Sequence, residues 1–152
     1  MEGAFYLEEL TPSHPVKPKI DDEVAAVSPS FAEIYAQAHI AQETALAQIA
    51  GVGYRKAVEF LIKDFCVSEA PEEADTIRAE ALGLTISKRI SDAQIKEVAR
   101  RAAWLGNDET HYTRKWEDKD IRDLKVLIEL TMNSIKNAML TKRYIAEMQD
   151  TK

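Results

Sequence analysis

The sequence predicts an all-α fold, and two observations support this prediction. Apolar residues recur every three or four positions along most of the chain, which is the spacing of one face of a helix. No segment shows the strict alternation of a half-buried strand, and 5 glycines and 5 prolines among 152 residues are too few for the turns of a β-sandwich or barrel. The length fits one domain with its own core.

Composition excludes several classes of protein. A net charge of -6 disfavours a broad basic surface for duplex DNA, although a local basic pocket stays possible. The single cysteine, Cys66, rules out an internal disulfide and favours a reducing compartment. No apolar run approaches the roughly 18 residues that span a membrane, and the N-terminus lacks a signal-peptide pattern. We therefore expect a cytoplasmic protein without membrane contact.

Residues 1–27 differ from the rest of the chain, because they show no helical period and hold three of the prolines. We expect an extended N-terminal arm there, followed by a helical domain over residues 28–152. A poorly ordered terminus is the alternative. The residues that would attach the arm to the domain are Phe5, Tyr6, Leu7 and Leu10.

The first two helices are predicted from caps and apolar spacing. Ser30 with Glu33 forms a capping box, and Gly51 and Gly53 are expected to end the first helix in a turn. A second helix over about residues 54–67 is apolar on most sides, so we expect it to be central. Its main stripe comprises Tyr54, Val58, Leu61, Ile62 and Phe65.

The second half of the chain predicts three further helical segments. Pro71 suits the start of a short helix, which Gly83 would end, and one or two helical turns follow over residues 85–90. Ser91 with Gln94 resembles another capping box, and Gly106 is expected as the C-cap of that helix.

Asp118 is expected to cap a long last helix that ends near Met148. Its apolar residues repeat at heptad-like spacing, which fits a core face or, as the alternative, a dimer contact. The expected fold is thus a bundle of about five helices. The repeat comprises Ile121, Leu124, Ile128, Thr131, Ile135 and Ala138.

One segment, WLGNDETHYTRKW over residues 104–116, gathers reactive side chains that a simple connector does not need. Histidine is the only side-chain type in it that titrates near neutral pH, so His111 is the natural general acid or base. Asn107 follows the expected C-cap glycine, where its amide can bind helix-end carbonyls.

The same segment offers groups for a nucleotide. Arg101 and Arg114 are candidates to hold a phosphate, and Tyr112 and Trp116 present rings on which a base can stack. The alternative is a structural loop that its tryptophans anchor on the core.

Arg55 and Glu59 are four residues apart on the central helix. A surface pair is the ordinary interpretation. Because this helix is apolar on most sides, Arg55 is expected to be partly buried, with Glu59 or a bound phosphate as its partner. No histidine has a second His or Cys at ligand spacing, so we expect no metal and no cofactor.

Residues 51–65 and 100–128 together resemble a bacterial and phage family, the domain-of-unknown-function family 4145, which is placed in the HEPN superfamily. The resemblance covers about residues 30–140. It implies a HEPN-like helical bundle with a long C-terminal helix, association with nucleotides or RNA, a defence or anti-defence setting in phage biology, and a homodimer. We expect that dimer to form either through the face on which the HEPN motifs of two copies meet, as the resemblance implies, or through the last helix.

Active members of the superfamily are similar in using an arginine, a polar residue directly after it and a histidine a few residues on. Asn107 and His111 match the last two, whereas Gly106 occupies the arginine's place. The expected function is therefore a module that binds a nucleotide or RNA and is weakly catalytic at most. The alternatives are a metal-independent endoribonuclease with His111 as general base, and a protein-interaction or dimerisation module without a ligand.

Overall fold

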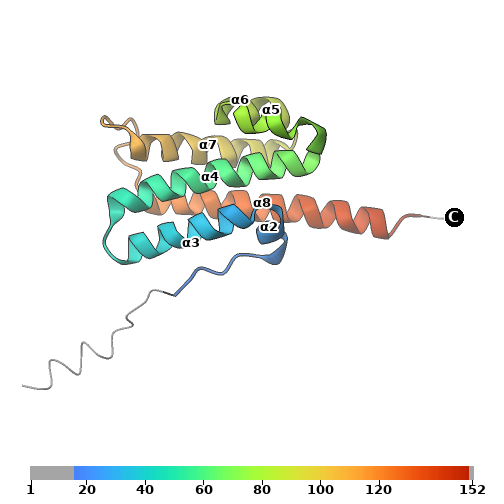
Figure 1. The fold of residues 1–152 in the computed structure, drawn as a ribbon, viewed down its shortest axis with the longest axis horizontal. Coiled ribbons are helices and arrows are strands. Elements are labelled where there is room, and N and C mark those ends of the chain that lie inside the picture. Colours follow the sequence, from blue (N-terminus) through green and yellow to red (C-terminus); the bar gives the residue numbers. More distant parts are fainter. Residues whose placement is uncertain (1–15, 151–152) are drawn as a thin grey trace, which may run out of the picture.

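The computed structural model describes residues 16–150, and in this range it contains helices and no strand. Four long helices form a bundle: α3 (Pro29–Glu43), α4 (Ala47–Glu69), α7 (Ala93–Thr110) and α8 (Ile121–Glu147) (Figure 1). The short segments are α2 (Asp22–Val27), the 3-10 turn η1 (Pro71–Glu73), α5 (Ala74–Ala79) and α6 (Leu82–Arg89). The all-α prediction is confirmed.

The described part has seven α-helices rather than about five. The difference lies in short helices that sequence patterns assigned to an arm or to a connection. Residues 22–27 were expected to be extended, but they form α2, whose Val24 is fully buried in the core. Most of the expected arm, including Phe5, Tyr6, Leu7 and Leu10, lies outside the described residues.

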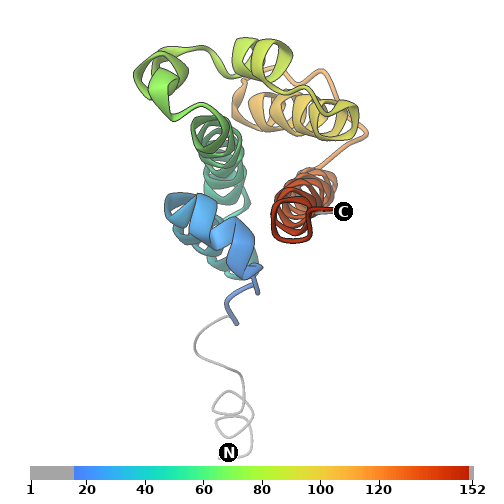
Figure 2. The same ribbon diagram turned by 90° about the vertical axis from the view of Figure 1, so that its right-hand side faces the viewer.

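Helix α4 is central, as its apolar surface predicts. It packs against α3 on one side and α7 on the other, and it also contacts α2, α5, α6 and α8 (Figure 2). Its stripe from Tyr54 to Phe65 is buried, and the Tyr54 ring lies 5.5 Å from that of Tyr35 on α3. The heptad-like residues of α8 face this core: Leu124, Ile128, Thr131 and Ile135 are buried.

The turn between α3 and α4 is not at the glycines. It falls at residues 44–46, where Ala45 has a positive φ of 61°. Gly51 and Gly53 lie inside α4, so the prediction that they end a helix is wrong. A Cβ at Gly53 would meet the Cβ of Ala38 at 2.9 Å, so α3 and α4 approach too closely at this position for a residue larger than glycine.

The predicted helix starts had the right residue types at neighbouring positions. Ser28, not Ser30, caps α3 and accepts from the N–H of Phe31, since Pro29 occupies the first helical position. Asp92, not Ser91, caps α7. Gly83 lies within α6 and ends no helix. The last helix begins after Asp120, not Asp118, with a complete capping box.

The last residue of α6, Arg89, forms ion pairs with two carboxylates that precede this helix in the chain. Arg89 donates to both carboxylate oxygens of Glu80, at 2.6 and 2.8 Å, and to Glu73 at 3.0 Å. Hydrogen bonding from Arg89 lowers the pKa of Glu80 to about 2. Cys66 is buried nearby on α4, and burial raises the pKa of its thiol to about 11. Within residues 16–150 no helix combines the length and hydropathy of a membrane span.

Candidate functional site

The candidate site lies at the C-terminal end of α7, and this helix is longer than predicted. Residues 104–110 are helical, so only residues 111–120 form the connection to α8. Gly106 is not a C-cap. A Cβ there would come within 3.2–3.3 Å of Cγ, Cα and Cβ of Arg55, so the glycine lets α7 pack directly on α4. His111 is the C-cap residue instead.

Arg55 lies at this contact between α4 and α7. Its Nε donates to Oδ1 of Asn107 at 3.1 Å, and its guanidinium pairs with Glu59. Glu59 also accepts from Lys63 at 3.0 Å. The Arg55 side chain is 32% exposed, which confirms the expectation of partial burial with Glu59 as partner.

Asp108 anchors the connection to the end of α7. Its carboxylate is buried and accepts from the backbone N–H groups of Lys115 and Trp116, at 2.6 and 3.0 Å. Arg114 lies against it, with Nε 3.4 Å from Oδ2. The same guanidinium donates to Glu109 and to the carbonyl of Lys119, each at 2.7 Å. Arg114 therefore already has several anionic and carbonyl partners within the protein.

The two carboxylates of this anchor have opposite pKa shifts. Desolvation would raise the pKa of Asp108, but the two backbone donors and Arg114 outweigh it, and the pKa is lowered. Burial raises the pKa of Glu109, because Arg114 offsets only part of the desolvation and Asp108 adds repulsion. The charge of Asp108 is thus stabilised, and its buried carboxylate lies against Arg114 rather than solvent.

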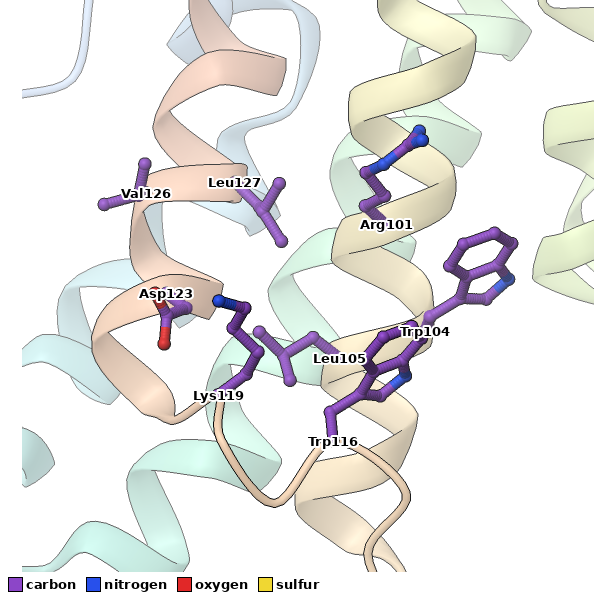
Figure 3. A pocket seen from close by; sticks show the side chains of 8 residues that line it. All are labelled: Arg101, Trp104, Leu105, Trp116, Lys119, Asp123, Val126 and Leu127. Carbon is purple, nitrogen blue, oxygen red and sulfur yellow. The ribbon is translucent and has the colours of Figure 1, made fainter.

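Two tryptophans form a platform at the surface next to this anchor. Trp104 and Trp116 are 47% and 43% exposed. Their ring centroids lie 6.4 Å apart and their planes are 9° from parallel, which is an ordinary geometry for an aromatic pair. Figure 3 shows Trp104 on α7 and Trp116 on the connection, brought together although they are twelve positions apart in the sequence. The hydrogen bond from the backbone N–H of Trp116 to the buried carboxylate of Asp108 holds Trp116 in this position.

A hollow of about 330 Å³ opens on one side of the platform, and we call it the histidine hollow. Its polar groups come from α7 and from the connection. The residues that line it are Trp104, Asn107, Asp108, His111, Lys115 and Trp116. Within residues 16–150, neither the imidazole of His111 nor the ammonium of Lys115 has a hydrogen bond or ion pair with another side chain.

A second hollow of about 430 Å³ lies between α7 and α8, and we call it the leucine groove (Figure 3). Its floor is apolar, with Leu105 and Leu127, and the charged residues stand at its edges. Arg101 lines this groove, but its guanidinium pairs with Glu97 one turn earlier on α7. The residues that line the groove are Arg101, Trp104, Leu105, Trp116, Lys119, Asp123, Val126 and Leu127.

The structure brings together only part of the predicted site. Asn107, His111 and Trp116 share the histidine hollow, and Arg55 joins them through Asn107. Tyr112 is fully exposed at 105% and lines neither hollow. Glu59 lies beyond Arg55 on α4. The predicted binding roles of Arg101, Arg114 and Tyr112 stay predictions, and none of these three residues lines the histidine hollow.

Sequence reasoning missed Trp104 and Lys115 as site residues. Trp104 was treated as a boundary of the segment, whereas its indole is half of the platform. The sequence-based hypothesis assigned phosphate binding to Arg114 and not to its neighbour Lys115. In the structure the Arg114 side chain packs against buried carboxylates, whereas the Lys115 side chain is exposed. This difference depends on Asp108, which accepts a hydrogen bond from the backbone N–H of Lys115.

Other candidate chemistry is sparse. Among residues 16–150 no three His, Cys, Asp or Glu side chains are grouped so as to hold a metal ion. His39 lies on α3, where its Nδ1 is 2.9 Å from the ammonium of Lys125 on α8. Comparisons of this chain with family models, with curated proteins and with solved structures found no match. The site is therefore interpreted from its own residues.

Proposed function

We propose that this chain is a HEPN-like module that binds a nucleotide or the end of a single-stranded RNA in the histidine hollow. The observation that supports the proposal most is the pair of half-exposed, parallel indoles beside two side chains, His111 and Lys115, without ion-pair partners in the described chain. Aromatic faces bind bases of any sequence by stacking, typically contributing about 1–3 kcal/mol per base.

The charges in the hollow suit one phosphate rather than a long polyanion. Lys115 supplies a point charge and His111 a hydrogen-bond donor, while the nearby carboxylate of Asp108 is neutralised by Arg114. Exposed Glu117 and Asp118 follow directly on the connection. Together with the net charge of -6, these groups would repel an extended nucleic acid. The proposed ligand is therefore a nucleotide or a terminal residue.

Intrinsic fluorescence tests this proposal directly, because the chain has only 2 tryptophans and both line the hollow. Adding 5′-AMP or hexaadenylate is expected to give a saturable quenching. Lys115→Ala and His111→Ala are each expected to weaken Kd about tenfold, which corresponds to about 1.4 kcal/mol. Lys119→Ala is the matched control, since Lys119 lines only the leucine groove.

N-acetyltryptophanamide corrects for absorption by the nucleotide. If quenching does not saturate at millimolar nucleotide, or if Lys119→Ala weakens binding as much as Lys115→Ala, the histidine hollow is not the binding site.

A second candidate function, metal-independent cleavage of RNA, is favoured by the position of Arg55. The HEPN-like motif lacks an arginine at Gly106, and Arg55 packs against this glycine and donates to Asn107. An arginine from α4 thus lies beside the place where the motif arginine is missing. In this role Arg55 would steady a phosphate and His111 would take the proton of the ribose 2′-OH.

For this candidate we expect cleavage of single-stranded RNA in EDTA, leaving 2′,3′-cyclic phosphate ends that mass spectrometry detects. Activity should disappear in His111→Ala, fall in Arg55→Ala and persist in Lys119→Ala. Absence of cleavage by micromolar protein over hours would remove the enzymatic candidate and leave the binding proposal intact.

A further inference from the structure

The outward side of α8 carries a second set of residues at heptad spacing, distinct from those that face the core. We call this set the outer stripe. It comprises Val126, Leu130, Asn133, Asn137, Leu140 and Tyr144. With 3.6 residues per turn these positions share one side of the helix, opposite the side of Leu124, Ile128 and Ile135. Val126, Leu130 and Tyr144 are 53%, 43% and 52% exposed.

The order of residues in the outer stripe is symmetric. Each residue has a counterpart of like chemistry equally far on the other side of Ile135: Val126 with Tyr144, Leu130 with Leu140, and Asn133 with Asn137. A two-fold dimer requires a surface that is complementary to itself. Two such helices, placed antiparallel and crossing the two-fold axis at the level of Ile135, set apolar residues against apolar residues at both ends and amides against amides in the middle.

We propose that α8 pairs with α8 of a second copy of this chain, antiparallel and along the outer stripe. The apolar residues at the two ends provide the hydrophobic contact. Asn133 and Asn137, both exposed in one copy, meet across the axis, where their amides hydrogen-bond. Asparagines at such positions lower the stability of a helix pair but select one register over others.

The charges beside the outer stripe fit the same register. Arg122, Glu129, Lys136 and Arg143 follow one another every seven residues along one edge of the stripe. In the antiparallel pair the position directly opposite Glu129 is residue 141 of the other copy, so Arg143 of that copy lies within one helical turn of Glu129. Within one copy Arg143 has a long ion pair of 3.9 Å with Glu147 and lies 5.3 Å from the centroid of the Tyr144 ring, so the contact with Glu129 would replace or share the exposed pair with Glu147. Two such ion pairs would form, one on each side of the axis. The two copies of Lys136 meet near the axis, where each is already paired with Asp21 of its own copy at 3.1 Å.

The shape of the molecule adds a reason for this contact. The C-terminal part of α8 extends past α3 and α4 and stands apart from the bundle (Figure 1). Tyr144, Ile145 and Met148 are exposed there, at 52%, 67% and 75%. An exposed pair of Lys142 with Glu69 of α4, 3.6 Å apart, holds this part to the bundle and contributes little. A helical end of few turns with so little tertiary contact is marginal in water. In the proposed dimer the first half of the second copy's α8 covers it. No residue of the histidine hollow belongs to the outer stripe, so this proposal does not depend on whether the hollow binds a nucleotide.

Sedimentation equilibrium of the full chain tests the association. We expect a dimer at micromolar concentration, and we expect Val126→Glu to shift it to monomer. Val52→Glu on α4 is the matched control, since Val52 is 52% exposed and lies outside the stripe. Circular dichroism shows that both variants remain helical. A wild-type chain that is monomeric at high micromolar concentration, or a Val126→Glu variant that dimerises normally, overturns the proposal.

Cysteine cross-linking tests the register. Val126→Cys and Tyr144→Cys are expected to form a disulfide-linked dimer when the two variants are mixed and hardly any when each is alone. In the antiparallel register, the two copies of either position lie about 27 Å apart along the axis, at 1.5 Å per residue. The native Cys66 is buried, and the unmodified chain serves as the control. Efficient cross-linking of each variant with itself would show a parallel pair and overturn the proposed arrangement.

Discussion

Replacing Asp108 by alanine is expected to lower the free energy of unfolding by about 3 kcal/mol, the largest loss we expect from a single polar side chain at the candidate site. The change removes the acceptor of two backbone N–H groups and leaves the Arg114 guanidinium without one of its carboxylates. Urea unfolding followed by circular dichroism measures the loss. Trp116 fluorescence should also shift, because the connection is no longer held on α7.

The control is Asp118→Ala in the same connection, whose side chain is 78% exposed and makes only a long contact of 3.9 Å with Lys119. Such a surface pair contributes little. Equal destabilisation by the two variants would contradict the anchoring role of Asp108.

The same residue predicts a pH dependence. The pKa of Asp108 is lower in the folded chain than in the unfolded chain, so its stabilisation is present above about pH 4, the unfolded value, and is lost as pH falls through the folded pKa. Glu109 acts in the opposite direction, because its raised pKa makes protonation favour the folded state. The stability difference between the wild type and Asp108→Asn should therefore shrink below about pH 4; a constant difference would contradict this assignment.

Alanine at two helical glycines is expected to have effects of opposite sign. Gly53→Ala should destabilise the chain by about 1–2 kcal/mol, because its Cβ would come within 2.9 Å of the Cβ of Ala38 and force α3 away from α4. Gly83→Ala should stabilise it by up to about 1 kcal/mol, since nothing lies within 4 Å of the new Cβ and alanine is the better helix former.

Thermal and urea unfolding of both variants measure this contrast, and Gly53→Leu should cost more than Gly53→Ala because the larger side chain has even less room. If Gly53→Ala stabilises the chain as Gly83→Ala does, then α3 and α4 are not held at the close separation that the structure shows.

Apolar periodicity predicted the helical fold well, because each long helix buries one face and the residues of that face recur every three or four positions in the sequence. The central position of α4 and the core face of α8 follow from their stripes and are confirmed. Caps were displaced by one or two residues, since Ser28 and Ser30, or Ser91 and Asp92, offer the same side-chain chemistry. The choice between them depends on where the helix can pack.

Glycines misled the sequence reasoning for a single physical reason. A glycine that ends a helix and a glycine that lets two helices touch look the same in one sequence. At Gly51, Gly53, Gly83 and Gly106 we expected helix ends. Gly51, Gly53 and Gly106 lie in continuous helix, and Gly83 lies in the first turn of α6, just after the break between α5 and α6. Three of them lie where another helix approaches: Gly51 lies against Glu109, Gly53 against Ala38, and Gly106 against Arg55. Tertiary contacts, not local backbone preference, explain these three.

The segment from residue 104 to 116 could be singled out from the residues alone, because two tryptophans around so many polar groups are unusual for a connector. Which of those groups line the histidine hollow depended on the fold. Arg114 is drawn inward by Asp108, Glu109 and a carbonyl, so it holds the connection in place, while its neighbour Lys115 is left exposed. Short-range sequence therefore determined the helices and the location of the candidate site. The pairing of α4 with α7, which joins residues more than fifty positions apart, decided the geometry of the site.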